Sequence, residues 1–230
     1  MPIISAKNIT KTFFIKGEKK NCVLNDISLD IERGKITALM GASGVGKTTL
    51  LYILGALDAP DSGEVLFKSD TGEEFLYKNM SSDELAKLRN KHIGFVFQFH
   101  HLLPEFNVLE NVMMPTLISG ASQNKAEEKA LYIMEKMQIL HIKKQRPNEL
   151  SGGEQQRAAI ARALVNSPEI IFADEPTGNL DSATAINMLK LIKEINAELG
   201  TTFLIVTHSE EMADCADTII NMKDGKVYYQ

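Results

Sequence analysis

The sequence predicts an α/β fold with a mostly parallel sheet, to which an antiparallel β subdomain and a helical insertion are added. Three observations predict this class. A glycine-rich loop at residues 41–48 separates a short apolar segment from a segment with helical spacing. Beyond residue 150 the chain alternates between helical and strand patterns, which is typical of parallel sheets covered by helices. The first 34 residues carry strand patterns alone, which favours antiparallel strands there.

The composition limits the class of protein. With 230 residues, 44% of them hydrophobic, the chain is expected to form one large domain or a domain with a subdomain. A net charge of −5 argues against a nucleic-acid-binding protein whose affinity depends on a broad basic face. Cys22 and Cys215 form neither a metal-binding spacing nor a redox pair, which favours a reducing, cytosolic setting. Since the sequence shows no apolar run of about 18 residues and no export leader, we expect it to dock on a membrane at most.

The N-terminal strands are expected to be short. Residues 3–6 and 12–15 are mostly apolar, residues 24–31 alternate, and the polar residues 16–21 between them are expected to form a loop. Phe13 and Phe14 stand next to each other before that loop. We expect one ring to be buried in the core and the other to offer a flat face on which a base can stack.

The loop from Gly41 to Thr48 fits the pattern G-x-x-x-x-G-K-S/T, which binds phosphate groups when it follows a strand and opens a helix. Residues 35–40 and 49–57 supply that strand and that helix. Successive N–H groups then point into one concavity at a helix N-terminus, which attracts anions. Lys47 adds a full charge near the outer phosphates, and the Thr48 hydroxyl is suited to binding Mg²⁺. The predicted phosphate-binding residues are Gly41, Ala42, Ser43, Gly44, Val45, Gly46, Lys47, Thr48 and Thr49, and the expected fold is that of the P-loop (RecA-like) NTPases.

The middle of the chain is expected to contain a helical insertion. Two short strands at 64–67 and 74–77, a helix at 81–89 and a buried strand at 93–97 lead to Gln98. From residue 99 the composition changes, and residues 122–140 form an amphipathic stretch. We therefore expect a nucleotide-binding core at residues 1–98 and 157–230 and a helical subdomain at residues 99–156.

Strand and helix patterns alternate again from Ser151 onward. Helices are predicted at 151–165 and 182–199, strands at 170–173 and 202–206, and a hairpin at Asp224-Gly225. One face of the helix at 182–199 is expected to be buried; it comprises Ile186, Leu189, Ile192, Ile195 and Leu199.

Polar residues follow four of the predicted strands directly, and parallel strands would bring them to one edge of the sheet. The phosphate loop follows the first of these strands, and Gln98, Asp174-Glu175 and Thr207-His208 follow the others. We expect Thr48 and Gln98 to bind Mg²⁺, with Asp174 behind them, acting through a metal-bound water. Glu175 would orient or deprotonate the attacking water, and His208 would contact the γ-phosphate. The expected catalytic residues are therefore Lys47, Gln98, Glu175 and His208, although a lone Gln or His at a strand end is usually a solvated or hydrogen-bonded polar group.

Taken together, these motifs resemble those of the ABC-type ATPases. Residues 150–157 match the signature sequence of that family, and the order and spacing of the other motifs agree over essentially the whole chain. The resemblance implies ATP and Mg²⁺ as cofactors and a homodimer with two ATP molecules between two chains that face head to tail. The signature of one chain would then hold the γ-phosphate bound to the other, through Leu150, Ser151, Gly152, Gly153 and Glu154. Asn179, Leu180 and Asp181 fall in the place of the D-loop, and Phe13 falls in the place of an adenine-stacking aromatic residue.

Two of these motifs also have purely structural interpretations. Ser151 and Glu154 form an S-x-x-E capping box that starts a helix, and Asp181 is suited to be the N-cap of the next one. The two roles are compatible at the signature, because Gly152 and Gly153 expose N–H groups at a helix N-terminus that can bind an anion.

Within the family, residues 97–112 look most like the ATPase subunit of the lipoprotein-releasing transporters of bacteria. The macrolide- or peptide-efflux type and the cell-division type share other motifs and remain alternatives. A soluble DNA-repair ATPase is disfavoured, because residues 48–151 hold neither extended heptads nor cysteines. The resemblance implies integral-membrane permease subunits contacted through the segment after Gln98, no nucleic-acid partner, and a peripheral position on the cytoplasmic face of the bacterial inner membrane. His100 and His101 suit either direct permease contact or a solvated loop.

Overall fold

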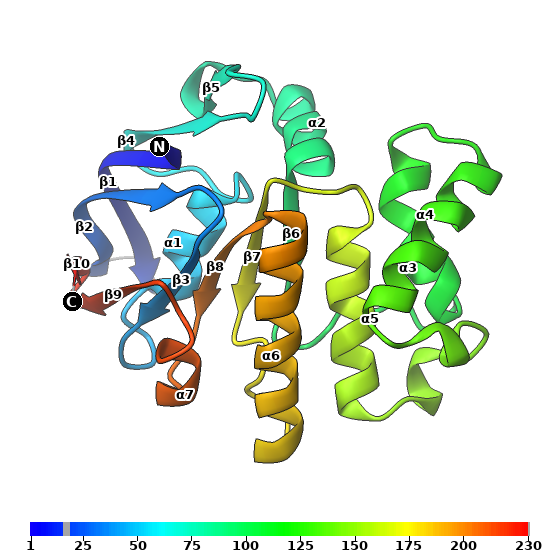
Figure 1. The fold of residues 1–230 in the computed structure, drawn as a ribbon. Coiled ribbons are helices and arrows are strands. Elements are labelled where there is room, and N and C mark those ends of the chain that lie inside the picture. The colour runs from blue at the N-terminus through cyan, green and yellow to red at the C-terminus, as the bar shows by residue number, and fades with distance from the viewer. Residues whose placement is uncertain (16–18, 230) are drawn as a thin grey trace. The chain divides into compact units, whose positions relative to one another are not determined.

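The computed structural model describes residues 1–15 and 19–229, without the side chains of residues 14, 15, 19 and 20. The chain forms two compact units, which we call unit 1 (Met1–Ala86 with Thr202–Gln230) and unit 2 (Lys87–Thr201). Figure 1 shows the elements of both. The loop predicted at 16–21 lies outside the described residues over 16–18, and from residue 19 the chain is a strand. The side chain of Phe14, the alternative stacking ring, also lies outside the described part.

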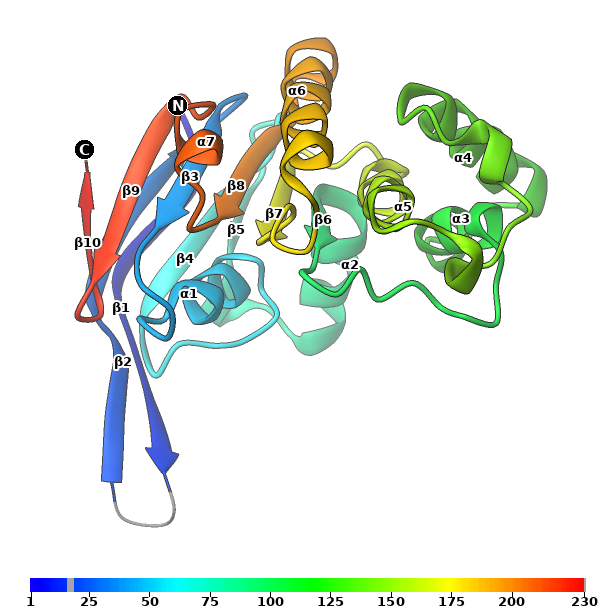
Figure 2. The same cartoon turned by 90° about the horizontal axis from the view of Figure 1, so that it is seen from below.

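Unit 1 contains a four-stranded antiparallel sheet in the order β2-β1-β4-β5. Its strands are β1 (Pro2–Ile15), β2 (Lys19–Glu32), β4 (Ser62–Lys68) and β5 (Glu74–Leu76). Figure 2 shows β1 and β2 as a long hairpin, whereas the sequence predicted separate short strands. The register shifts between Ala6 and Ile9, where Asn8 has a φ of 52° and its side chain donates to Asp26 at 2.8 Å. Such a bulge breaks the apolar alternation without ending the strand, which explains the difference.

The strand that leads to the phosphate loop lies centrally among the parallel strands of unit 1. β3 (Ile36–Met40) pairs in parallel with β8 (Thr202–Val206) and with β9 (Thr218–Lys223), and β10 (Lys226–Tyr229) pairs antiparallel with β9. The turn between β9 and β10 has positive φ at Asp224 and Gly225, as a two-residue hairpin turn requires, so the predicted hairpin is confirmed. The helices of this unit are α1 (Lys47–Leu54), the 3-10 helix at Tyr77–Asn79 and α7 (Glu210–Ala213).

Unit 2 combines two parallel strands with a group of helices. α2 (Ser82–His92) leads into it, and β6 (Ile93–Val96) pairs with β7 (Ile170–Asp174). α3 (Val108–Ile118), α4 (Gln123–Lys136) and α5 (Gly152–Leu164) pack against one another, as Figure 1 shows in green and yellow-green. α6 (Ser182–Leu199) and the 3-10 helices at Leu140–Ile142 and Pro147–Glu149 complete it. The mixture of parallel strands, antiparallel sheet and helical block confirms the predicted fold class.

The predicted buried face of α6 is wrong at its two ends. Leu189, Ile192 and Ile195 are buried, but Ile186 is 46% exposed and Leu199 is 36% exposed. Each step of three residues along a helix turns by about 300°, which is about 60° short of a full turn. Three such steps lead from Ile186 to Ile195, so these two side chains lie on roughly opposite sides of the helix. The helix after the phosphate loop also ends early, at Leu54, and Leu57 is 43% exposed.

Within the described residues, no helix is both long enough and apolar enough to cross a membrane. The proposed boundaries of the nucleotide-binding core and the helical subdomain remain predictions.

Candidate functional site

The phosphate loop connects β3 to α1 within unit 1. Gly41 has a φ of 150°, and a Cβ there would lie 2.3 Å from the carbonyl oxygen of Met222 on β9. A side chain cannot occupy that space, so the neighbouring strand itself requires glycine at the first position of the loop. The helix starts at once, because Leu50 N donates to Gly46 O at 2.9 Å. Sequence and structure therefore agree on a strand, a tight turn and a helix N-terminus.

Lys47 is the one buried cation of this loop, with its side chain folded back over the backbone. Its Nζ donates to the carbonyl oxygens of Gly41 and Ala42 at 2.8 and 3.0 Å, and the residue is 7% exposed. Two carbonyl dipoles offset part of the desolvation of the ammonium group. The charge is thus held beside the N–H groups at the start of α1, where the helix dipole also attracts an anion.

His208 leaves the sheet at the same edge as the phosphate loop. β8 lies beside β3 with Val206 opposite Leu39, and Thr207 N donates to Leu39 O at 3.1 Å. The imidazole of His208 follows directly and is exposed. Unit 1 therefore brings His208 to the end of β3 at which the loop begins, as the strand-end rule predicted.

Phe13 lies on β1 and is 42% exposed, and Lys11 Nζ stands 5.5 Å from the centre of its ring. Its partner across the hairpin is Asn21, two residues before Val23 on β2. A Cβ on Gly46 of the phosphate loop would lie 2.7 Å from Val23 Cγ1, so β2 passes directly against the loop. Two strand residues span about 7 Å. An exposed aromatic face therefore lies a short distance from the loop, although its role remains a prediction.

In unit 2 the ends of β6 and β7 bring together Gln98, Asp174 and Glu175. Val96 lies opposite Ala173. Gln98 follows Val96 by two residues, and Asp174 and Glu175 follow Ala173 by one and two, so all three leave the sheet at the same edge. Glu175 has a φ of 46°, a left-handed conformation that is unfavourable for a residue with a Cβ. Its carboxylate Oε2 would lie 3.1 Å from a Cβ on Gly178, and Gly178 N donates to Glu175 O at 3.1 Å. A tight turn therefore fixes the direction in which this carboxylate leaves the strand.

The predicted D-loop contacts this edge directly. Asn179 Nδ2 donates to the backbone oxygen of Gln98 at 3.0 Å. Asp181 is the N-cap of α6, since its two carboxylate oxygens accept from Thr184 N and Thr184 Oγ1 at 3.1 and 2.6 Å. These bonds to Thr184 lower the pKa of Asp181. The structural interpretation of Asp181 is confirmed, and its role across an interface remains a prediction.

The signature residues start α5 through the predicted capping box. Ser151 Oγ accepts from Glu154 N at 3.4 Å, and Glu154 Oε2 accepts from Ser151 N at 2.8 Å and from Ser151 Oγ at 2.6 Å. The bonds from Ser151 lower the pKa of Glu154, because they stabilise the carboxylate form. Gly153 lies against α6, since a Cβ there would stand 2.8 Å from Thr184 Cγ2. Ser151 and Gly152 are exposed, so the N-terminus of this helix faces outward.

The proposed metal ligands provide a hydroxyl, an amide and a carboxylate oxygen, from Thr48, Gln98 and Asp174. Oxygen donors of this kind suit Mg²⁺, which keeps several water or phosphate ligands of its own. Thr48 belongs to unit 1, whereas Gln98 and Asp174 belong to unit 2. Over residues 1–15 and 19–229, no group of three or more His, Cys, Asp or Glu side chains could hold a metal ion.

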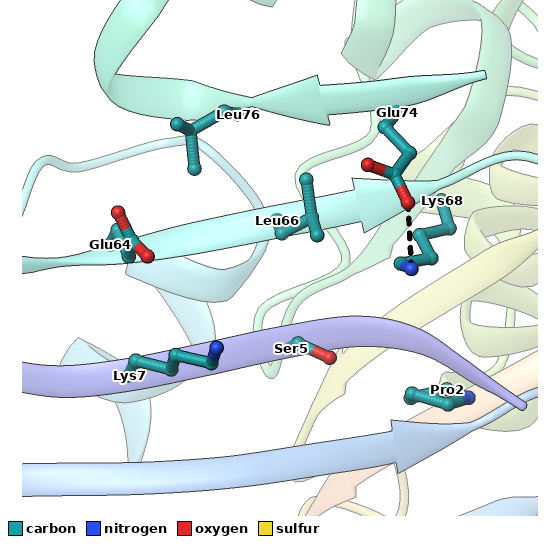
Figure 3. Close-up of a pocket in the computed structure, with 8 residues that line it drawn as sticks. All are labelled: Pro2, Ser5, Lys7, Glu64, Leu66, Lys68, Glu74 and Leu76. Atoms are coloured by element: carbon teal, nitrogen blue, oxygen red, sulfur yellow. Dashed lines mark ion pairs between the residues drawn. The ribbon is translucent and has the colours of Figure 1, made fainter.

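A separate hollow of about 450 Å³ lies on one face of the antiparallel sheet and holds none of the predicted site residues (Figure 3). Leu66 and Leu76 lie near its middle, and Lys68 forms an ion pair with Glu74 at 2.7 Å at one end. Glu64, at the other end, accepts from Lys78 at 2.6 Å, which lowers its pKa. These paired, solvated charges are typical of an exposed sheet face.

Two residues near the site were missed by the sequence reasoning. Asn111 is fully buried and binds the backbone of the segment after Gln98: its Oδ1 accepts from Leu103 N at 2.7 Å, and its Nδ2 donates to Leu103 O and Phe106 O. Arg162 donates to the carbonyl oxygens of His100 and His101. The sequence contains only weak indications of these roles. Asn111 is a polar residue in the apolar first half of α3, and Arg162 is a charged residue near the alanine-rich end of α5.

Three comparisons bear on this geometry. A family model described as ABC transporter matches residues 24–178. The lipoprotein-releasing system ATP-binding protein LolD of Buchnera aphidicola subsp. Schizaphis graminum is 47% identical over 226 residues, which cover 98% of this chain and 96% of that protein. LolD of Myxococcus xanthus is 45% identical over 227 residues, 99% of each chain. Among solved structures, the dimeric ATP-binding cassette MJ0796 in a post-hydrolysis state with ADP and Pi has a TM-score of 0.88 and 40% identity, covering 99% of this chain and 97% of that one.

Proposed function

Since this chain belongs to the ABC transporter family and is an ATPase of that family, we propose that it drives the release of lipoproteins from the inner membrane of a bacterium. One observation carries the proposal: 44–47% identity with lipoprotein-releasing ATP-binding proteins over at least 97% of the chain. A match over that much of the chain spans the phosphate loop, the signature and the segment after Gln98. It favours lipoprotein release over the macrolide- or peptide-efflux and cell-division alternatives.

Unit 1 binds the nucleotide in this proposal. The N–H groups of residues 41–49 surround the β- and γ-phosphates, and Lys47 leaves its loop carbonyls to pair with them. Phe13 on β1 stacks on adenine. Its exposure supports this role, and so does its pairing with Asn21 on β2, two residues from the Val23 that lies against the loop. Stacking of this kind stabilises a base by about 1–3 kcal/mol.

Glu175, Asp174 and His208 act on the triphosphate in this proposal. Glu175 orients the attacking water and accepts its proton, and the left-handed turn at this residue supports a fixed direction for the carboxylate. Mg²⁺, held by Thr48 and Gln98 with Asp174 behind, would neutralise charge on the β- and γ-phosphates. His208 donates a hydrogen bond to the γ-phosphate. Attack by water breaks the bond between the γ-phosphorus and the bridging oxygen, which leaves ADP and phosphate.

Two copies of the chain enclose two ATP molecules. Ser151, Gly152 and Gly153 at the exposed start of α5 bind the γ-phosphate held by the other copy, with Leu150 and Glu154 supporting the turn. Asn179, Leu180 and Asp181 form the D-loop beside them. The dimeric state of the related cassette with ADP and Pi supports this arrangement.

The segment after Gln98 binds the permease, which keeps the chain on the cytoplasmic face of the inner membrane as a peripheral subunit. Phe99, Leu103 and Phe106 are 69%, 40% and 37% exposed, and such a patch on an ATPase subunit favours a protein partner. No nucleic acid takes part, in keeping with the net charge of −5.

Purification of the tagged chain from detergent-solubilised membranes tests the proposal. The co-purified permease, reconstituted into lipid vesicles with a lipoprotein, should release that lipoprotein on addition of ATP. The Glu175→Gln variant should form the same complex without release. A co-purified permease that transports a macrolide or acts on no lipoprotein would contradict lipoprotein release and leave the ATPase assignment intact.

A further inference from the structure

Arg162 holds the segment after Gln98 by two consecutive backbone oxygens. Its Nη1 donates to His101 O at 2.6 Å and its Nη2 to His100 O at 2.7 Å. We propose that Arg162 is a positioning residue that couples the signature helix α5 to residues 98–106, which we call the Gln98 loop. Movement at the signature then reaches the permease-binding loop inside one chain. The proposal rests on the proposed function insofar as the loop is taken to bind the permease.

The backbone of the loop is shaped to receive this guanidinium. His100 and His101 have φ values of 39° and 48°, both in the left-handed region. Successive carbonyls of an extended chain point to opposite sides, whereas a helical turn of either hand aligns them. Two consecutive residues with a Cβ in this conformation are unfavourable unless surrounding contacts hold them. The forked guanidinium donates to both oxygens at once, a geometry that the single ammonium of lysine cannot reproduce.

Arg162 makes these bonds without a carboxylate to balance its charge. Within the described residues, no Asp or Glu lies at ion-pair distance from Arg162, and burial lowers the pKa of its guanidinium. The pKa of His100 is also lowered, by burial first and then by the charges of His101 and Arg162. Partial burial of an unpaired cation lowers the stability of the fold, because the charge loses hydration free energy. An apolar side chain in this place would avoid that cost. The bonds to the loop are therefore the feature that distinguishes arginine here from a packing residue.

Other contacts to the loop come from outside α5. Asn179 donates to Gln98 O at 3.0 Å at the start of the loop, and the Phe97 ring meets the His101 ring edge-on at 5.3 Å between centroids. At the far end, Asn111 on α3 binds Leu103 and Phe106 as described above. Among these contacts, only Arg162 comes from the helix that the signature opens.

The position of Arg162 along α5 suits transmission. Ten residues separate it from Gly152 at the start of the helix, a distance of about 15 Å along the axis. A hydrogen-bonded helix moves nearly as a rigid rod, so a displacement of its N-terminus is passed to its last turn. The guanidinium then pulls on two peptide groups of the Gln98 loop.

The same helix provides a matched control. Arg157 Nη1 donates to the carbonyl oxygen of Met137 at 3.0 Å, so it also binds a backbone oxygen from α5 but not one in the Gln98 loop. We compare Arg162→Met and Arg157→Met, which remove the guanidinium donors and keep an unbranched side chain, shortened equally at both positions. Arg162→Lys keeps the charge and one donor group, and provides a milder variant should Arg162→Met fail to fold.

Hydrogen exchange on the isolated full-length chain tests the coupling without a permease. In the Glu175→Gln background, ATP should slow exchange of the amides at 98–106 several-fold. Arg162→Met should abolish that difference between ATP-bound and nucleotide-free protein, Arg162→Lys should reduce it, and Arg157→Met should keep it. An ATP effect at 98–106 that is unchanged in Arg162→Met and Arg162→Lys, or that is absent from the Glu175→Gln parent, would overturn the proposal.

The purified complex supplies the second readout. We expect the ratio of permease-stimulated to basal ATP hydrolysis to fall at least fivefold in Arg162→Met and to stay within twofold of wild type in Arg157→Met. A wild-type ratio in Arg162→Met would also overturn the proposal. If the parent complex releases no lipoprotein, the proposed function fails, while the exchange experiment still decides the role of Arg162.

Discussion

Gly41→Ala should damage the phosphate loop through a backbone clash that Gly44→Ala avoids. A Cβ at Gly41 would lie 2.3 Å from Met222 O, and its backbone φ is 150°. Overpacking of this severity costs about 1–3 kcal/mol, and a left-handed backbone adds about 1–2 kcal/mol for a residue with a Cβ. We therefore expect Gly41→Ala to lower the free energy of unfolding by about 2–5 kcal/mol.

Gly44 is the matched control, because its φ of 80° carries the same kind of backbone penalty while nothing lies within 4 Å of the added Cβ. Its loss should be about 1–2 kcal/mol. Urea unfolding of both variants without nucleotide gives the two free energies, which should differ by about 1–3 kcal/mol. Calorimetric titration with ADP should also show weaker binding in Gly41→Ala than in Gly44→Ala, because the clash at Gly41 displaces the loop whose N–H groups are proposed to hold the phosphates. Equal losses of stability in the two variants would refute the argument that the Met222 carbonyl requires glycine.

Three further predictions concern the nucleotide and the signature helix. Lys47→Ala should abolish detectable ATP binding in calorimetry while circular dichroism stays native, and unchanged affinity would remove Lys47 from its assigned role. Phe13→Ala should weaken ATP binding by about tenfold and leave the binding of inorganic triphosphate unchanged, whereas equal effects on both would place Phe13 away from the base. The folded-state pKa of Glu154 is lowered by Ser151, so its contribution to stability is present above the unfolded pKa of about 4.3 and is lost as the pH falls through the lower folded value. The stability difference between wild type and Glu154→Gln, from urea unfolding, should therefore shrink as the pH falls below about 4.3, and a constant difference would contradict the capping contact.

The parts of the site that the sequence predicted are those set by local chemistry. The phosphate loop, the capping box at Ser151 and the N-cap at Asp181 each depend on a few neighbouring residues, and all three have the expected geometry. The strand-end rule placed His208 next to the loop in unit 1, and Gln98 next to Glu175 in unit 2. These placements follow from parallel pairing alone.

The features that the sequence did not predict depend on contacts between distant segments. The bulge at Asn8 is held by Asp26 on the neighbouring strand, so no pattern within β1 reveals that the strand continues. The exposure of Ile186 follows from helical drift over nine residues, which a count of apolar positions overlooks. Arg162 and Asn111 donate to backbone oxygens of the segment after Gln98. Every residue has a backbone oxygen, so the sequence of that segment does not reveal these bonds.

The central claim is that two copies of this chain enclose ATP, with Ser151 of each copy on the γ-phosphate held by the other. Size-exclusion chromatography of Glu175→Gln with Mg-ATP tests it most directly, because slow hydrolysis should trap the enclosed state. We expect a dimer with ATP and a monomer without nucleotide, and a monomer in both conditions when Lys47→Ala is added. A monomer of Glu175→Gln that has bound ATP would contradict the claim.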